Sequence, residues 1–297
     1  MSFIPIEYNN ICYSKDIKCN IKEIAGNFDK ENIEYYSNYS LHTEYSYGQR
    51  KFNTNIVNKY KSICEAHKEY VPQLWKSVSW AKEFADFIFE LTNNNEPTII
   101  EIHPPFNDYC NLSQFIERYF EFEQKIHSLY SNVDIVIENR SGSIYKGGKF
   151  LISNAKQVLE LGQIINSQKI NLGIVLDFPQ LLTAEHIDTE FFNKEKFSNC
   201  VASLDDIKNV IKGIHIWAKK KNEKGRWIAH NGNFDTYFCN KKENIDYFVS
   251  CINSFCNDGV SRYFVPEVNS GKDDLDKISK CFLSNKEKPL TFSNDKS

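Results

Sequence analysis

The sequence predicts an α/β fold and, within that class, a single TIM (β/α)8 barrel. Three observations support this prediction. The chain has 297 residues, 41% of them hydrophobic, so it is long enough to form one barrel with a full core. Short apolar runs alternate with longer amphipathic stretches, which is the pattern of repeated βα units. The clearest apolar runs also end on or near a histidine, aspartate or glutamate, as strands do at the mouth of a barrel.

The expected strands account for all eight positions of the barrel. Five runs are apolar along their length, as parallel strands buried on both faces are: residues 98–103, 134–138, 172–177, 211–217 and 262–267. A weaker strand is expected at 39–42. The first 38 residues must supply the other two, at 3–7 and 21–25. Because this is a short stretch for two βα units, we expect the barrel to be irregular at the N-terminus.

The expected helices lie between these strands. Apolar residues recur with the 3.6-residue period of a helix over 78–91, 112–129, 155–165, 245–256 and 275–282. Residues 44–95 form a long polar and helical stretch. We therefore predict one barrel domain over residues 1–283, followed by a polar tail at 284–297.

Composition narrows the classes of protein. The 36 basic and 39 acidic side chains give a formal charge of −3, so a nucleic-acid partner is possible but receives no support from net charge. No run of 18 apolar residues occurs, and the start MSFIPIEYNN lacks the features of a signal peptide, so we expect a cytoplasmic protein without a membrane segment. Nine cysteines without any CxxC pair indicate reduced thiols used mainly in packing. The oligomeric state is not indicated.

Six polar side chains stand at the ends of separate apolar runs. In a closed barrel these ends converge on one rim, so the six together favour a metal site. Any one of them alone could equally be a solvated loop residue or a hydrogen-bonded core residue. Their donor atoms are nitrogen and carboxylate oxygen without thiolate, which suits zinc, manganese or iron. The six predicted metal ligands are His42, His103, Glu138, Asp177, His215 and Glu267.

An ordered set of short motifs resembles the xylose-isomerase-like TIM barrels and, within them, endonuclease IV (AP endonuclease family 2). The motifs are IEIHPP (100–105), IENRSGSIYKGG (137–148), GIVLD (173–177), GIHIWAKK (213–220), AHNGNFD (229–235) and VPEV (265–268). LHTEYSY (41–47) looks like the histidine-bearing end of that family's second strand. EIHPP looks like its HPG turn and ENRSG like its ENTAG segment. The resemblance spans roughly residues 39–270.

This resemblance implies a role for each of the six residues. Glu138 would bridge two metals, with His42 and His103 on one of them. The second metal would take Asp177, His215 and Glu267. The cofactor is then expected to be a divalent metal, with zinc first and manganese or iron as alternatives.

Two departures from the family pattern bear on the number of metals. Gln180 stands where the family has a histidine, and Ile228 stands where it has an aspartate, although His230 is kept. Because two of three ligands for a third metal are missing, we expect a dinuclear or a mononuclear site, with His230 free to contact substrate. His186, on the following loop, is a candidate to replace the lost ligand.

Further residues are expected at the same rim. The run 219–226 holds five basic side chains in eight positions, so Lys219 can reach a substrate phosphate, although a solvated loop is the alternative. Arg140 follows Glu138 by two positions and would either orient that carboxylate or bind substrate. Three aromatic side chains would stack on sugars or bases, or else pack in the core: Trp217, Trp227 and Phe234.

The reaction predicted first is metal-dependent hydrolysis of a phosphoester. Two metals that share a carboxylate stabilise the attacking and leaving oxygens of an in-line displacement, and the pair His42 and His103 favours two metals. Glu138, Glu267 and His230 are the expected catalytic residues. A sugar isomerase or epimerase is the first alternative, because it needs one metal, with Glu138 and Glu267 as ligand and proton shuttle. A multinuclear iron oxidase and a non-catalytic binding barrel remain further alternatives. The substrate is expected to carry a phosphate or a sugar.

Overall fold

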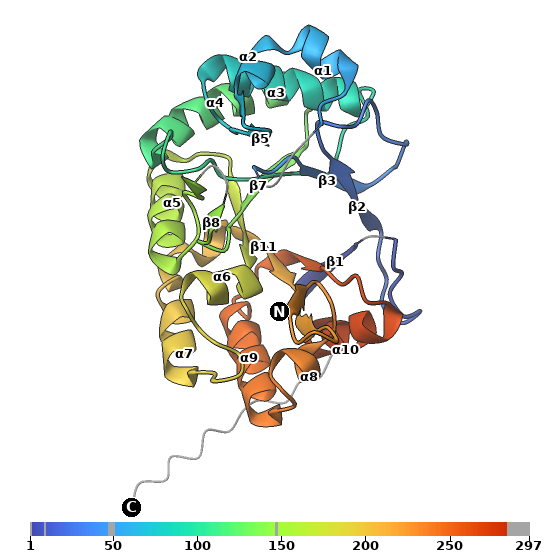
Figure 1. Cartoon of the computed structure of the whole chain (residues 1–297), viewed down its shortest axis with the longest axis vertical. Coiled ribbons are helices and arrows are strands. Elements are labelled where there is room, and N and C mark those ends of the chain that lie inside the picture. The colour runs from blue at the N-terminus through green and yellow to red at the C-terminus, as the bar shows by residue number, and fades with distance from the viewer. Residues whose placement is uncertain (1, 9, 47–50, 146–147, 284–297) are drawn as a thin grey trace, which may run out of the picture.

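Eight parallel strands close into a barrel in the computed structural model, which describes residues 2–8, 10–46, 51–145 and 148–283 (Figure 1). The order of strands around the barrel follows their order in the chain, and the last strand pairs with the first. This confirms the predicted TIM-barrel class. The strands are β1 (Ser2–Glu7), β2 (Ile21–Gly26), β3 (Tyr39–Thr43), β6 (Ile99–Ile102), β7 (Asp134–Glu138), β10 (Gly173–Asp177), β11 (Ile211–Ile216) and β14 (Ser261–Pro266).

The five predicted helices are confirmed and cover the outside of the barrel. They are α3 (Val78–Leu91), α4 (Leu112–Leu129), α5 (Ala155–Gln168), α9 (Lys242–Phe255) and α10 (Lys272–Leu283). Helices α4 and α5 begin after Asn111 and Asn154, whose side chains accept the third helical N–H in reciprocal capping boxes. Shorter helical segments complete the ring: α1 (Thr54–Lys59), α2 (Lys61–Glu65), α6 (Phe178–Ala184), α7 (Lys194–Ala202), the 3-10 helix η1 (Asp205–Val210) and α8 (Phe234–Tyr237).

The N-terminal part of the barrel is irregular, as the short sequence available for its first strands had suggested. Among the described residues no helix lies between β1 and β2 or between β2 and β3, and Figure 1 shows only loops there. Phe28, in the second of these loops, is fully buried against three aromatic rings of α3, at centroid distances of 5.2–6.4 Å from Trp80, Phe84 and Phe87. Phe28 and other loop residues, such as Tyr13 and Ile33, thus contribute core packing where helices are missing.

Three short antiparallel hairpins decorate the connections. They are β4 (His67–Lys68) with β5 (Val71–Pro72), β8 (Ile144–Tyr145) with β9 (Gly148–Lys149), and β12 (Lys219–Lys221) with β13 (Trp227–Ala229). The last of these carries the basic run 219–226, for which a solvated loop was the alternative to a substrate-binding role. Its strands pair Lys219 with Ala229 and Lys221 with Trp227, so the run folds back on itself beside β11.

Alternation along the strands separates an outer core from a ligand layer inside the barrel. On β6, Ile100 and Ile102 pack in the core between strands and helices, whereas Ile99 and Glu101 line the interior. The interior floor is apolar and consists of Ile6, Ile99, Val136, Val175 and Val265. Two positions further along several strands the inward residue is acidic or a histidine. The candidate metal ligands therefore form the layer directly above these apolar residues.

The structure bears on the predictions for the cysteines and for membrane segments, but not on the prediction for the C-terminal tail. All nine cysteines are free thiols, as predicted, with Cys110, Cys200 and Cys256 buried. Within the described ranges, no helix combines the length and the apolar character needed to cross a lipid bilayer. The predicted tail 284–297 and residues 47, 146 and 147 of the quoted motifs lie outside the described residues.

Candidate metal centre

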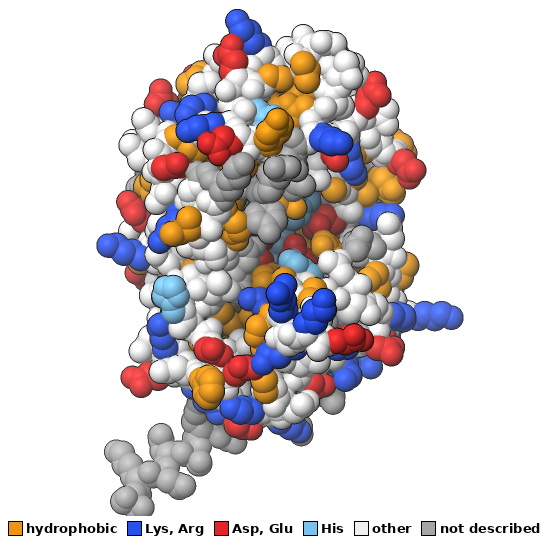
Figure 2. All heavy atoms as spheres, in the orientation of Figure 1, with side chains coloured by type: hydrophobic (Ala, Val, Ile, Leu, Met, Phe, Trp, Pro, Cys, Tyr) orange, Lys and Arg blue, Asp and Glu red, His pale blue; other side chains and the backbone are white. Residues whose placement is uncertain are grey.

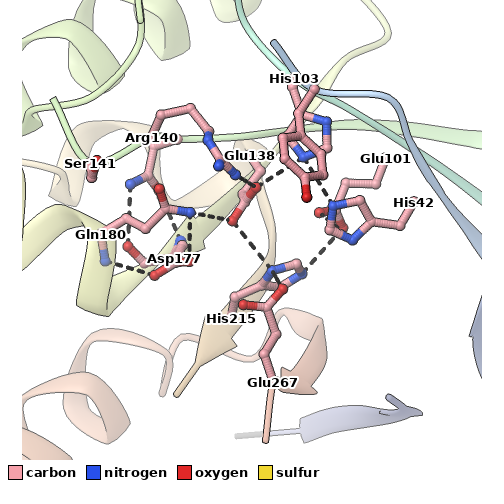
Figure 3. Close-up of polar contacts among 12 residues, drawn as sticks. His42, Glu101, His103, Glu138, Arg140, Ser141, Asp177, Gln180, His215 and Glu267 are labelled. Atoms are coloured by element: carbon pink, nitrogen blue, oxygen red, sulfur yellow. Dashed lines mark hydrogen bonds and ion pairs between the residues drawn. The ribbon is translucent and has the colours of Figure 1, made fainter. Parts of the chain in front are cut away.

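The six side chains predicted as ligands meet at one end of the barrel (Figure 3). Together with Glu101, they form two groups that share Glu138, and in each group one nitrogen or oxygen per residue lies within 4.8 Å of the others. The first group is His42, Glu101, His103 and Glu138; the second is Glu138, Asp177, His215 and Glu267. This arrangement of buried histidines and carboxylates could hold metal ions.

The first group has the spacing of ligands around one ion. The Nε2 atoms of His42 and His103 are 3.0 Å apart, and His103 Nε2 is 3.1 Å from Glu138 Oε2. Ligand atoms that each bind a zinc-like ion at about 2.0–2.1 Å are about 3 Å from one another. His103 Nδ1 lies 3.2 Å from the carbonyl oxygen of Glu44, so a proton on Nδ1 leaves the lone pair of Nε2 inside the group.

The second group uses the other oxygen of Glu138. His215 Nδ1 is 3.6 Å from Glu138 Oε1 and 3.3 Å from Glu267 Oε1. Asp177 and His215 are neighbours across the sheet, because β10 and β11 pair these two residues directly. Glu138 therefore faces one ligand group with each of its oxygens.

Asp177 is the most heavily hydrogen-bonded of the six. Its Oδ2 accepts bonds of 2.7 Å from Trp217 Nε1 and 2.8 Å from Gln180 Nε2, and its Oδ1 caps α6 by accepting from the backbone N–H of Gln180. A carboxylate has about four lone-pair positions, so one position on Oδ1 stays open for an ion. Asn139 fixes the strand end further by donating to the Asp177 carbonyl.

Gln180 and Arg140 hold Glu138 from the side opposite the histidines. Gln180 Nε2 donates to Glu138 Oε1 and to Asp177 Oδ2, both at 2.8 Å, and so lies between two carboxylates. Arg140 Nη1 donates to Glu138 Oε2 at 2.7 Å, while its guanidinium lies 5.4 Å over the Tyr45 ring. Of the two roles predicted for Arg140, the structure shows the contact that orients Glu138.

Two further carboxylates in this cluster were missed by sequence reasoning. Glu101 lies between His42 and His215, and Glu23 lies 3.2 Å from His42 Nδ1. A usable signal existed for Glu101, because it precedes His103 by two positions in an apolar strand and must share its face. Glu23 stands in the polar sequence IKEIAG, where no apolar run marks it as inward-facing.

The rim of the site opens into a cavity of about 1390 Å³. Figure 2 shows this hollow with histidine and acidic side chains inside it and basic side chains along one edge. His230 stacks on Trp217 with ring centroids 4.5 Å apart, and its Nδ1 is 3.3 Å from Glu267 Oε2. Lys219 Nζ lies 5.4 Å over the same Trp217 ring. These three side chains form the wall above the second ligand group.

Several predicted positions are corrected by the structure. His186 is exposed and joins no ligand group among the described residues, since it follows α6 on the surface while Gln180 fills the gap beside Asp177. Phe234 is buried in the outer core, so it is a packing residue. Trp227 is 39% exposed on β13 and does not line the cavity. His42 lies near the end of the third barrel strand, β3, whereas the resemblance had implied the second.

Burial and mutual charge shift the titration of the cluster in the metal-free protein. Burial lowers the pKa of His42, but Glu23 and Glu101 outweigh it and raise the pKa to about 10. Burial lowers the pKa of His103. Burial opposes ionisation of Glu138, yet Arg140 and the two neighbouring histidines hold its pKa well below the usual range. Burial and the charges of other carboxylates raise the pKa of Asp177. The cluster therefore mixes charged acids, protonated acids and cationic histidines.

Buried atoms without hydrogen-bond partners give an independent test of whether an ion fits. Among the described residues these atoms include both ring nitrogens of His215, Glu101 Oε1 and Glu23 Oε2. Buried polar atoms in folded proteins are nearly always paired, so a group of unpaired ones that converge indicates a missing partner. Nitrogen and carboxylate oxygen are the donors that zinc, manganese and iron accept. The residues present thus fit a divalent cation.

No protein-family model and no curated protein sequence matches the chain. Among solved structures, it is similar to the crystal structure of AsfvAP:AG, with 11% identity, coverage of 93% of this chain and 94% of that chain, and a TM-score of 0.49. It is also similar to the probable 3-DHS dehydratase AsbF from Bacillus anthracis, with 12% identity, coverage of 89% and 100%, and a TM-score of 0.42. A third is a sugar phosphate isomerase/epimerase from Parabacteroides distasonis, with 12% identity, coverage of 83% and 80%, and a TM-score of 0.37.

Likenesses with identities and TM-scores this low say nothing about chemistry, so the fold assignment rests on the pairing of the strands. The closed barrel of eight parallel strands is the TIM-barrel fold that the resemblance of the sequence motifs implied.

Proposed function

We propose that the chain is a divalent-metal-dependent hydrolase that acts on a phosphoester. The observation that carries the proposal is the position of Glu138, which faces one ligand group with Oε2 and the other with Oε1. Two divalent ions, when bound, stabilise both the attacking and the leaving oxygen of an in-line displacement. Six barrel strands contribute to the two groups, so the ligands stand on a rigid frame.

The remaining side chains of the rim have roles that follow from their positions. Arg140 holds the Glu138 carboxylate in one orientation through a 2.7 Å hydrogen bond. Lys219 and His230 line the cavity above the second group, where they can donate to phosphate oxygens. Trp217 offers an aromatic face to a sugar or a base, although His230 covers part of it. The substrate we expect is a phosphorylated compound that carries a sugar.

A one-metal sugar isomerase or epimerase is the second candidate. It is favoured by the fact that Glu138, Asp177, His215 and Glu267 form a complete ligand group by themselves. Glu138 and Glu267 would then serve as ligand and proton shuttle. In the isomerase His103 would only contact a substrate hydroxyl, so the close approach of His42 to His103 and of His103 to Glu138 would hold no metal, and for this reason we place the hydrolase first.

Replacement of His103 separates the two candidates. In a two-metal phosphoesterase, His103→Ala should lower kcat by about 10²–10⁴-fold, because metal ions contribute several kcal/mol at the transition state and 1.4 kcal/mol is a factor of ten. Turnover is measured on a panel of phosphodiesters and a panel of ketoses, with bound metal counted for each variant. His186→Ala is the matched control, since it removes an exposed histidine outside the site and should leave activity unchanged.

Each outcome of this experiment assigns a function to the site. Full metal content and full phosphodiesterase activity in His103→Ala would contradict the hydrolase proposal. Ketose turnover that is abolished by Glu267→Gln, while His103→Ala raises only KM, would establish the isomerase instead. Two or three irons per chain would point to an oxidase, and the absence of both metal and turnover to a binding barrel.

A further inference from the structure

We infer that Glu101 is a positioning residue that orients one histidine of each metal, and so couples the two metal positions. The inference rests on the two-metal site of the proposed function. Glu101 was not among the ligands that the sequence motifs suggested. It lies on β6, is 2% exposed, and points into the barrel between β3 and β11 (Figure 3).

The carboxylate of Glu101 faces the outer nitrogens of two histidines. Its Oε2 is 3.2 Å from His215 Nε2, and its Oε1 is 3.7 Å from His42 Nδ1. Strand register places it there, because β3 and β6 pair His42 directly with Glu101. One side chain thus connects a histidine of the first ligand group with a histidine of the second.

The other nitrogen of each histidine faces its metal group. His42 Nε2 is 3.0 Å from His103 Nε2, and His215 Nδ1 is 3.3 Å from Glu267 Oε1. A neutral imidazole carries one proton and one lone pair, so a proton held on the outer nitrogen directs the lone pair inward. The Glu101 carboxylate lies beside the outer nitrogen of both rings, and its negative charge favours a proton on each of these nitrogens and so the metal-binding tautomer of both.

Glu23 performs the same task for one histidine only. Its Oε1 is 3.2 Å from His42 Nδ1, and no ion pair joins it to His215 among the described residues. Glu23 and Glu101 are both buried carboxylates of the same cluster, and they differ in the number of histidines they contact. This difference provides a matched comparison within the site.

Direct ligation of an ion by Glu101 is the competing explanation, since Glu101 belongs to the group with His42, His103 and Glu138 and also lies close enough to Glu23 and His215 to form another. Two observations favour the positioning role. Each oxygen of Glu101 lies beside the ring nitrogen that faces away from the metal group, since the other nitrogen of His42 faces His103 and the other nitrogen of His215 faces Glu267. The cluster also balances without a third ion, because two divalent cations and Arg140 offset its five carboxylates.

Metal titration of the full chain without substrate tests the inference. Zinc is titrated against a competing chelator into metal-free wild type, Glu101→Gln and Glu23→Gln. Glu101→Gln should weaken both binding steps by about 10–100-fold, the usual effect of losing a carboxylate that orients a ligand. Glu23→Gln removes the same charge but should weaken only one step. Because no turnover is measured, failure of the phosphoesterase proposal leaves this result intact.

A spectroscopic readout distinguishes orientation from general damage. In the cobalt-substituted protein, proton NMR should show imidazole N–H signals of His42 and His215 that exchange slowly with solvent. Glu101→Gln should accelerate exchange of both signals, and Glu23→Gln that of one. Thermal unfolding of the metal-free variants shows whether each still folds. If Glu101→Gln does not fold, Glu101→Asp keeps the charge but cannot reach both rings, and should weaken at least one binding step about tenfold.

Three results would overturn the inference. The first is that both binding steps in a folded Glu101→Gln variant stay within twofold of wild type. The second is a wild-type stoichiometry of three ions that falls to two in Glu101→Gln, which would make Glu101 a ligand. The third is a wild-type chain that binds fewer than two ions, which would remove the pair of metals that Glu101 is inferred to couple.

Discussion

Gln180 illustrates how one residue changes the chemistry of a shared position. The family pattern has a histidine here, which would offer a lone pair to a metal, whereas an amide nitrogen can only donate. In this chain the Gln180 amide donates 2.8 Å hydrogen bonds to both Glu138 and Asp177. It therefore offsets part of the repulsion between two buried carboxylates without a cation. The substitution was visible in the sequence, but its bridging role depends on the fold.

Gln180→Met should destabilise the metal-free protein by about 1–3 kcal/mol, because two buried carboxylates each lose one hydrogen-bond donor while a side chain of similar size fills the space. The free energy of unfolding is measured by urea denaturation in the presence of a chelator. Gln163→Met, at an exposed position of α5, is the control and should stay within about 0.5 kcal/mol of wild type. Equal stability of the two variants would show that the Gln180 bridge contributes nothing.

At the scale of elements, the predicted helix bounds were most accurate where one sequence signal was strong. The bounds of α3 and α4 agree with prediction, since each has an apolar stripe with a helical period and a side-chain cap at its start. The hairpin in the basic run 219–226 was not predicted, because the pairing of β12 with β13 depends on a turn at Gly225, which has a φ of 72°. Polar hairpins lack the alternation by which strands are recognised.

Helix α5 contains a glycine, Gly162, at a position where a neighbouring element packs too closely for a larger side chain. A Cβ on Gly162 would lie 2.7 Å from Cγ2 and Cδ1 of Ile207 on η1. Alanine at this position gains about 1 kcal/mol in helix propensity but overpacks the contact, which costs about 1–3 kcal/mol. We expect Gly162→Ala to be less stable than wild type in urea denaturation, and Gln163→Ala, on the same turn, to be neutral. A gain in stability from Gly162→Ala would show that η1 moves freely.

A buried arginine joins several elements at the end of the barrel where the strands begin, opposite the metal centre. Arg262 on β14 is fully buried and donates to the carbonyls of Ile211, Cys256 and Lys208, which belong to or flank β11, α9 and η1. Asp258 is its charged partner, with two hydrogen bonds of 2.7 Å. The hydrogen bonds and charge of Arg262 lower the pKa of Asp258 below the ordinary aspartate range.

This pair predicts a pH dependence of stability. Because the folded pKa of Asp258 is depressed, its contribution is full above about pH 4, the ordinary aspartate pKa, and declines as the pH falls toward the folded value. At pH 7, Asp258→Asn should be less stable by about 3 kcal/mol, since a buried guanidinium loses its counterion. The difference from wild type, measured by urea denaturation, should shrink between pH 5 and pH 3. A difference that stays constant over this range would contradict the assignment.

On the scale of the whole molecule, the barrel and most of its ligand layer could be predicted because strand ends carry their own signal. Parallel strands read as apolar runs, so a charged residue at the end of a run stands out, as Glu138 and Asp177 do. Glu23 could not be recognised, because β2 is a polar strand on the side of the barrel that lacks helices. The loop around Phe28 was equally unpredictable, since it is fixed by long-range aromatic contacts.

The central claim is that one carboxylate joins two metal positions at the mouth of the barrel. The most direct test counts metal ions per chain by elemental mass spectrometry, after equilibration with zinc, manganese or ferrous iron and removal of free metal. Wild type should retain two ions of the preferred element, and Glu138→Gln no more than one, because the amide keeps a single oxygen and can serve only one of the two ligand groups. His186→Ala should match wild type. A wild-type chain that retains one ion or none with all three metals would contradict the account.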